Sequence, residues 1–107
     1  MATVLRGNAD QEVQVLKAAL DAYEAQHHGA EASLYRNNPA SIRLRVIDGR
    51  FEGMSRSRRH GDVWDFLAAR VNDEALADVS QLLTLAPSEL KNSLANLEFE
   101  DPIPSKI

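Results

Sequence analysis

Residues 41–47, Ser-Ile-Arg-Leu-Arg-Val-Ile, alternate between apolar and charged side chains with a clear period of two. Successive side chains of a β-strand point to opposite faces of the sheet. Ile42, Leu44 and Val46 should therefore face a core, whereas Arg43 and Arg45 should face the other way. A fold that contains this strand needs a sheet with one buried face and one polar face or edge.

Two other segments of the chain predict further strands. Residues 31–36, Glu-Ala-Ser-Leu-Tyr-Arg, alternate more weakly, and Asn37-Asn38-Pro39 is typical of a turn. The two strands should form an antiparallel hairpin. Residues 79–85, Val-Ser-Gln-Leu-Leu-Thr-Leu, are mostly apolar and predict a third, largely buried strand.

Helical spacing accounts for most of the rest. Asn8 as an N-cap, with Gln11 three residues later, predicts a helix over 9–27 whose apolar face carries Val13, Leu16, Leu20 and Tyr23. A turn and an ordered loop over 48–58 should lead into a helix over 59–71, with one further helical turn at 74–78. Pro87 is suited to the first position of a last helix that ends near residue 97.

This order predicts an α+β fold, αββααβ(α), in which helices pack on a three-stranded mixed sheet to form a two-layer sandwich. The same order is found in class II KH-like domains. Residues 1–97 should form a single domain, since a chain of 107 residues can bury one core of modest size. Residues 98–107 are acidic and contain prolines, and they predict a tail lying on the surface.

The composition limits the classes of protein and the kinds of site that this chain can form. The chain is 44% hydrophobic and 26% charged, as expected of a soluble globular protein, and it has no apolar run long enough to cross a membrane. We expect a cytoplasmic protein, a monomer or weak homodimer, with no membrane partner. The absence of cysteine excludes disulfides, thiolate metal sites and cysteine nucleophiles.

An enzyme is disfavoured. Ser55, Ser57, His60 and Asp62 supply the residue types of a hydrolase, but their order in a short arginine-rich segment matches no catalytic motif. The five glycines are dispersed, so no phosphate-binding loop is present. The acidic residues form no recognisable catalytic pair.

Positive charge is concentrated in the middle of the chain. Residues 36–59 carry a net charge of +5, between an N-terminal segment of −3 and a C-terminal segment of −6. A block of this kind predicts either a surface that attracts nucleic acid or acidic partners, or a solvated arginine face. The candidate nucleic-acid or partner-binding residues are Arg43, Arg45, Arg50, Arg56, Arg58 and Arg59. The Gly-x-x-Gly loop with which KH domains hold single strands is replaced here by Gly53-Met-Ser-Arg56.

Histidines are the candidate metal ligands. His27 and His28 are adjacent and would point about 100° apart on a helix, so they are poorly placed to bind one ion together. A complete site within the chain is not expected. His60 could contribute to a site shared with another protein, or it could cap a helix without binding any ligand.

The segment 51–67 resembles the BolA family. The resemblance is carried by Phe51-Glu-Gly-Met, then Arg59-His60, then Val63-Trp64 with Phe66-Leu67, all in the family's order and spacing. It extends more loosely over residues 9–95 through the order of elements. The resemblance implies a non-enzymatic adaptor or regulator that pairs with a monothiol glutaredoxin around a shared 2Fe–2S cluster, and for some members DNA binding.

Carried over residue by residue, the resemblance makes His60 a cluster ligand and gives Arg59 the role of holding the loop or meeting an acidic partner. The family's further ligand, a histidine or cysteine, comes from the loop between the first two strands. The corresponding residues here, Arg36-Asn37-Asn38-Pro39-Ala40, form a tight turn with neither residue type. Any cluster role is therefore expected to be degenerate.

Overall fold

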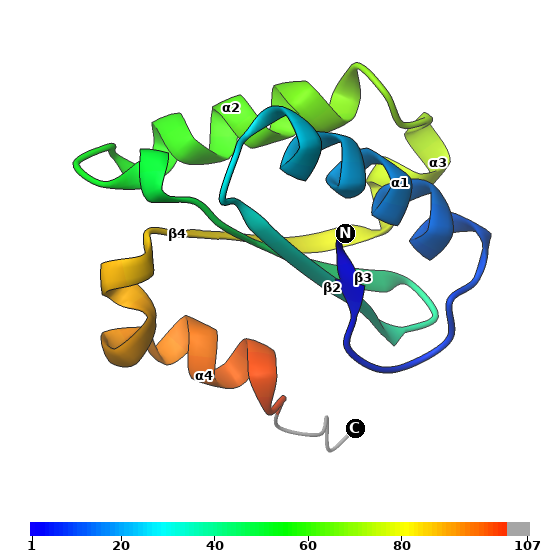
Figure 1. Cartoon of the computed structure of the whole chain (residues 1–107). Helices are drawn as coiled ribbons and strands as arrows, with labels where there is room; N and C mark the ends of the chain where they lie inside the picture. The colour runs from blue at the N-terminus through cyan, green and yellow to red at the C-terminus, as the bar shows by residue number, and fades with distance from the viewer. Residues whose placement is uncertain (103–107) are drawn as a thin grey trace.

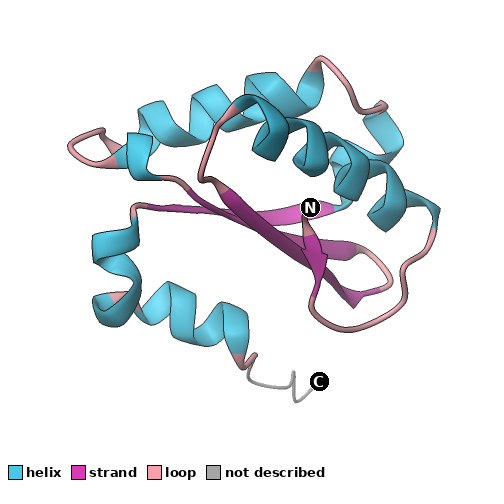
Figure 2. Ribbon diagram, in the orientation of Figure 1, coloured by secondary structure: helices cyan, strands magenta, loops and turns pink. Residues whose placement is uncertain are grey.

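The computed structural model describes residues 1–102, which fold into a mixed four-stranded sheet with helices on both faces (Figures 1 and 2). The strands lie in chain order: β1 (Thr3–Val4), β2 (Glu31–Asn38), β3 (Ser41–Ile47) and β4 (Val79–Leu85). The β2–β3 pair is antiparallel, whereas β1–β2 and β3–β4 are parallel. The α+β class and the central hairpin agree with the sequence prediction.

The predicted number of strands was wrong by one, because β1 joins β2 at the edge of the sheet. Thr3 and Val4 lie opposite Ser33 and Leu34. Two residues are too few to show a periodicity, so the sequence pattern could not reveal this strand.

The first helix, α1 (Gln11–Gln26), begins later than predicted and has a different N-cap. The carboxylate of Asp10 accepts a hydrogen bond from the Val13 N–H at 3.1 Å. The prediction of Asn8 as the cap was therefore wrong. Asp and Asn cap helices about equally well, and Asp10 is additionally held by Arg36.

Two short helices and one longer helix follow the hairpin. A 3-10 helix, η1 (Gly49–Phe51), occupies part of the predicted loop, and α2 (Arg56–Ala68) begins three residues before the predicted start. Helix α3 (Asp73–Asp78) then leads directly into β4. Gly53 has a φ of +76°, which lets the chain turn sharply before α2.

The main core lies between the sheet and the layer formed by α1, α2 and α3. The inward-facing strand residues are those predicted, Ile42, Leu44 and Val46, each with no solvent exposure. Helix side chains and Phe51 complete the core, including Val13, Leu16, Leu20, Val63 and Leu67.

The second face of the sheet is covered by the C-terminal helices, η2 (Pro87–Asn92) and α4 (Leu94–Glu100), as Figure 1 shows. Phe99 is fully buried there, with its ring centroid 4.9 Å from that of Tyr35. The predicted two-layer arrangement was therefore wrong. Residues 98–100, expected in a surface tail, are helical, and residues 103–107 of that tail lie outside the described residues.

No helix within residues 1–102 combines the length and the apolar character required to cross a membrane.

Candidate functional site

His60 lies on the exposed surface of α2, one turn inside the helix. Ser55 caps this helix, because its hydroxyl accepts a hydrogen bond from the Arg58 N–H at 3.3 Å. The alternative of a helix-capping His60 was therefore wrong. The imidazole ring lies nearly parallel to the indole of Trp64, with centroids 6.1 Å apart and planes 12° apart.

A groove of about 350 Å³ separates the start of α2 from the edge of β4 and the start of α4. Arg56, Ser57 and His60 form one wall, residues 82–85 form the floor, and residues 93 and 95 form the opposite side. A second hollow of about 230 Å³ continues past His60 toward Trp64 and the first residues of β4. His60 thus lies at the junction of two hollows that follow one strand.

The floor of this groove is the edge of the sheet, since β4 pairs with β3 on one side only among residues 1–102. The carbonyl of Leu85 accepts a hydrogen bond from the Asp48 N–H, so it points toward the β3 side. The carbonyl of Thr84, the adjacent residue, accepts instead from Arg59 on α2. The direction of the backbone N–H and carbonyl groups alternates from residue to residue along a strand. The N–H and carbonyl of Leu82 therefore point into the groove, as the carbonyl of Thr84 does.

Arg59 is buried and links the helix that forms one wall of the groove to the neighbouring segments of the chain. Its guanidinium donates to the Glu89 carboxylate through Nη1 at 2.6 Å and Nη2 at 2.9 Å, and Nε donates to the Met54 carbonyl at 3.0 Å. The hydrogen bonds from Arg59 lower the pKa of Glu89 from 4.5 to about 2. Arg59 therefore joins α2 to η2, and only 5% of its side chain remains exposed for a partner.

Arg43 and Arg45 do lie on the polar face of β3, but that face is covered. Arg43 donates to both carboxylate oxygens of Glu98 at 2.9 Å. Arg45 contacts Glu100 at 2.7 Å and is buried beneath α4. The expectation of an exposed arginine face was wrong at these two positions, because α4 brings acidic residues from the far end of the chain.

Arg50 belongs to a separate cluster of polar side chains at the end of α1. Its Nη2 donates to the Tyr23 hydroxyl at 3.2 Å, and that hydroxyl in turn donates to Asp48 at 2.8 Å. Burial, with the nearby Asp48 carboxylate adding to it, raises the pKa of Tyr23 to about 12. Arg50 keeps 43% of its side chain exposed, so it remains accessible at the surface.

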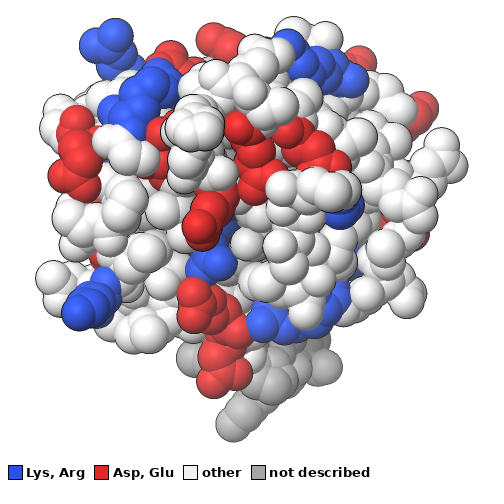
Figure 3. Space-filling model, viewed as in Figure 1, with Lys and Arg blue, Asp and Glu red and all other residues white. Residues whose placement is uncertain are grey.

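Arg56 and Arg58 are exposed, and the ion pairs of residues 1–102 include neither of them. The six predicted arginines are therefore divided between three covered and three accessible side chains. Figure 3 shows basic and acidic side chains interspersed on the face it presents, rather than one continuous basic patch.

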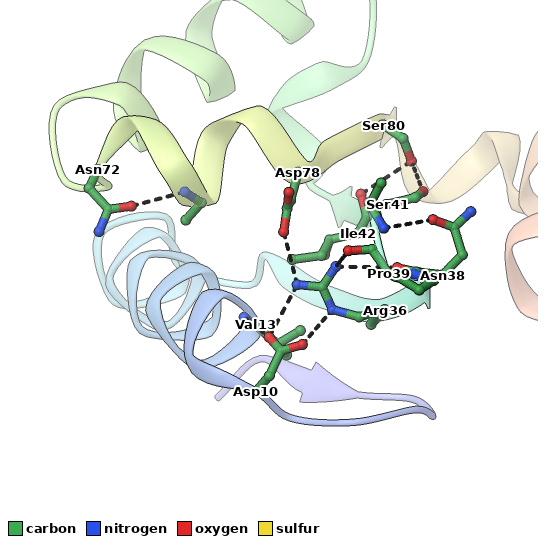
Figure 4. A network of polar contacts seen from close by, with 12 residues as sticks. Asp10, Val13, Arg36, Asn38, Pro39, Ser41, Ile42, Asn72, Asp78 and Ser80 are labelled. Atoms are coloured by element: carbon green, nitrogen blue, oxygen red, sulfur yellow. Dashed lines mark hydrogen bonds and ion pairs between the residues drawn. The ribbon is translucent and has the colours of Figure 1, made fainter.

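The turn between β2 and β3 holds a polar network in place of a metal ligand (Figure 4). Arg36 bridges Asp10 and Asp78, with Nη2 2.9 Å from the Asp78 carboxylate, and it also donates to the carbonyls of Asn38 and Pro39. A hollow of about 650 Å³ lies beside this network. The charged side chains of Arg36, Asp10 and Asp78 are paired with one another. They therefore link α1, the hairpin and α3.

The residues 1–102 contain no group of three or more His, Cys, Asp or Glu side chains that could hold a metal ion. His27 does not approach His60: its ring stacks on Tyr23 at 3.9 Å and contacts Phe66, which lies on a different face of α2 from His60 and Trp64. The described donor set therefore does not fit a 2Fe–2S cluster held by this chain alone. His60 offers one nitrogen ligand, which a partner would have to complete.

The sequence prediction missed the edge of β4 and the residues that accompany it. Strand 79–85 was expected to be largely buried, and Thr84 and Leu85 are buried, whereas Leu82 and Leu83 are only partly buried beside His60. The sequence contained no local signal for this edge, because the position of a strand in a sheet depends on the path of the whole chain. Glu98 and Glu100 were also missed as partners of arginines more than 50 residues away.

Comparison with protein-family models, with curated proteins and with solved structures finds no match to this chain.

Proposed function

We propose that this chain is a non-enzymatic, BolA-like adaptor that docks a monothiol glutaredoxin along the groove between α2 and β4. His60 would supply the single ligand that this chain contributes to a shared 2Fe–2S cluster. The observation that carries the proposal is the position of His60, exposed at the junction of two hollows on the free edge of the sheet.

The neighbouring residues support an adaptor rather than an enzyme. Arg59 and Glu89 fix the start of α2 against η2, so the backbone that carries His60 is held by an ion pair whose arginine is buried. Ser57 also lines the groove, but no carboxylate lies among the lining residues to orient a catalytic histidine. The groove offers docking surface, one imidazole and exposed positive charge at Arg56.

The test is to mix the full chain with a monothiol glutaredoxin that carries a 2Fe–2S cluster and to record visible absorption and circular dichroism. We expect a complex and an altered cluster spectrum with the wild-type chain. His60→Ala should abolish the spectral change without lowering the melting temperature, because the side chain is exposed. His28→Ala, which removes another exposed histidine at the end of α1, is the matched control and should behave as wild type. An unchanged spectrum and no complex with the wild type would reject the proposal.

A second candidate function is binding of single-stranded nucleic acid, favoured by the accessible side chains of Arg50, Arg56 and Arg58. With at most three phosphates neutralised, the logarithm of the binding constant should fall with the logarithm of salt concentration with a slope of about −2. Arg56→Gln combined with Arg58→Gln should remove most of that slope. Absence of binding to oligonucleotides at low ionic strength would assign these arginines to a protein interface or to solvent.

A further inference from the structure

Helix α4 presents acidic side chains to the sheet and leucines to the solvent. Leu94 and Leu97, one turn apart, are 81% and 57% exposed, whereas Glu98 reaches the sheet and pairs with Arg43. A helix that only covers a sheet normally buries its apolar side and exposes its charged side. The reversed orientation of α4 indicates that the sheet beneath it recognises carboxylates.

Three arginines bind α4. Arg43 and Arg45 project from β3, where Arg43 holds a carboxylate and Arg45 donates to Glu100 at 2.7 Å. Arg6, in the loop after β1, donates through Nη1 to the Phe99 carbonyl at 3.3 Å. Positive charge facing carboxylates and carbonyl groups is the arrangement expected where an acidic peptide is bound.

A single aromatic contact accompanies these charges. Phe99 is the one buried apolar side chain of α4, and its ring lies against Tyr35, with the guanidinium of Arg45 4.9 Å from the ring centroid. This contact lies on the face of the sheet opposite to α1 and α2 (Figure 1). Phe99 is not part of the main core, so departure of α4 would leave that core covered.

The attachment of α4 is incomplete and separate from that of η2. The Arg45 side chain is 10% exposed, yet its Nε has no hydrogen-bond partner among the described residues. A buried donor without a partner is costly, and this cost weakens the net hold on α4. The ion pair between Arg59 and Glu89 fixes η2 to α2, so η2 does not depend on α4 for its position.

We propose that the face of β2 and β3 under α4 is a docking site for an acidic, aromatic segment of a partner protein, and that α4 occupies this site in the free chain. The partner segment carries a carboxylate on each side of an aromatic residue, as Glu98-Phe99-Glu100 does. Arg43 and Arg45 bind the two carboxylates, and Tyr35 receives the aromatic ring. The partner must displace α4, so α4 is an autoinhibitory element.

This inference goes beyond the proposed function and does not depend on it. The docking site lies on the face of the sheet, whereas His60 lies beside the edge of β4. Its test needs neither an iron–sulfur cluster nor His60, so either proposal can fail without the other.

The probe is a fluorescein-labelled peptide with the sequence of residues 94–102, titrated with the full chain and followed by fluorescence anisotropy. Phe99→Ala weakens the hold on the chain's own α4. This variant should bind the peptide at least about tenfold more tightly than wild type, because a site occupied within the chain has a reduced apparent affinity. Leu97→Ala changes an exposed side chain of the same helix, and as the matched control it should bind as weakly as wild type.

Two further comparisons make the test specific. Glu98→Gln combined with Glu100→Gln weakens the hold on α4 without changing Phe99, and it should give a similar gain in peptide binding. In the Phe99→Ala chain, Arg43→Glu should abolish binding of the peptide, and a peptide with lysine in place of Glu98 should restore it.

Single-stranded oligonucleotides are titrated against the same variants, and their binding should not increase when α4 is weakened. The proposal would be overturned if neither weakened variant gained affinity for the peptide, if the exchange of charges failed to restore binding, or if only oligonucleotide binding increased.

Discussion

Replacing Glu89 by glutamine tests the ion pair on which the candidate site is built. Glutamine has the same shape and keeps an oxygen that can accept the Ala86 N–H, now bonded to Glu89 at 2.8 Å. The substitution removes only the negative charge that faces Arg59. It leaves the buried guanidinium of Arg59 with neutral partners, the carbonyls of Met54 and Thr84 among them.

The size of the effect follows from the pKa of Glu89, which is lowered from 4.5 to about 2. At about 1.4 kcal/mol per pH unit, that difference would correspond to about 3 kcal/mol of stability at neutral pH. The Glu89 side chain is 40% exposed, so solvent screening reduces the contribution. We expect Glu89→Gln to lower the free energy of unfolding at pH 7 by about 2 kcal/mol, part of which is the cost of leaving Arg59 without a counter-charge.

The pH dependence has a definite sign. A carboxylate whose pKa is lowered by folding stabilises the protein above its unfolded pKa, and this stabilisation is lost as the pH falls toward its folded pKa. The gap between wild type and Glu89→Gln should therefore be constant above about pH 5 and should narrow between about pH 4.5 and 2.

Urea denaturation followed by Trp64 fluorescence, repeated at several pH values, measures this gap. Glu31→Gln is the control, because Glu31 is exposed and forms no ion pair with the described residues. Its effect should stay below about 0.5 kcal/mol. A similarly small effect of Glu89→Gln at pH 7, or a gap that does not change between pH 7 and 3, would refute the reasoning.

Three further outcomes are expected. Burial raises the pKa of Tyr23 to about 12, so spectrophotometric titration of a Tyr35→Phe variant should show no phenolate near pH 10. The free energy of unfolding should fall as the pH rises from about 10 to 12. A phenolate transition near pH 10 in the folded protein would contradict this. Asp10→Ala should cost about 1–2 kcal/mol in urea denaturation, whereas Asn8→Ala should cost less than about 0.5, and the reverse order would restore Asn8 as the cap. Phe99→Ala should make the amides of 94–100 exchange rapidly while those of α1 remain protected, and unchanged exchange in α4 would show that Phe99 does not anchor it.

The parts of the fold that were predictable are those specified by local periodicity. Residues 42, 44 and 46 are buried as their alternation indicates, and the face of α1 that carries Leu16 and Leu20 packs on the sheet. The starts of both long helices were less well predicted, because several residues near each start can cap a helix. Asp10 and Ser55 act as the caps in the folded chain.

The environment of the arginines could not be predicted in the same way. Alternation shows that Arg43 and Arg45 share a face of β3, but it does not show what lies on that face. Their partners, Glu98 and Glu100, come from a segment whose acidic composition suggested a tail. Contacts between segments so far apart depend on the path of the whole chain, and a single sequence contains no local signal for them.

The adjacent residues Arg59 and His60 show how one motif can serve both the fold and the site. Neighbouring positions on a helix point about 100° apart, so Arg59 turns inward to Glu89 while His60 stays at the surface. The motif in 51–67 was ambiguous because both residue types suit a binding site. In the folded chain the arginine fixes the wall of the groove, and the histidine is one of the side chains that the wall presents, beside Arg56 and Ser57. On the proposed function, weakening the Arg59–Glu89 pair should reduce binding of the partner at His60, even though neither of these two side chains needs to touch the partner.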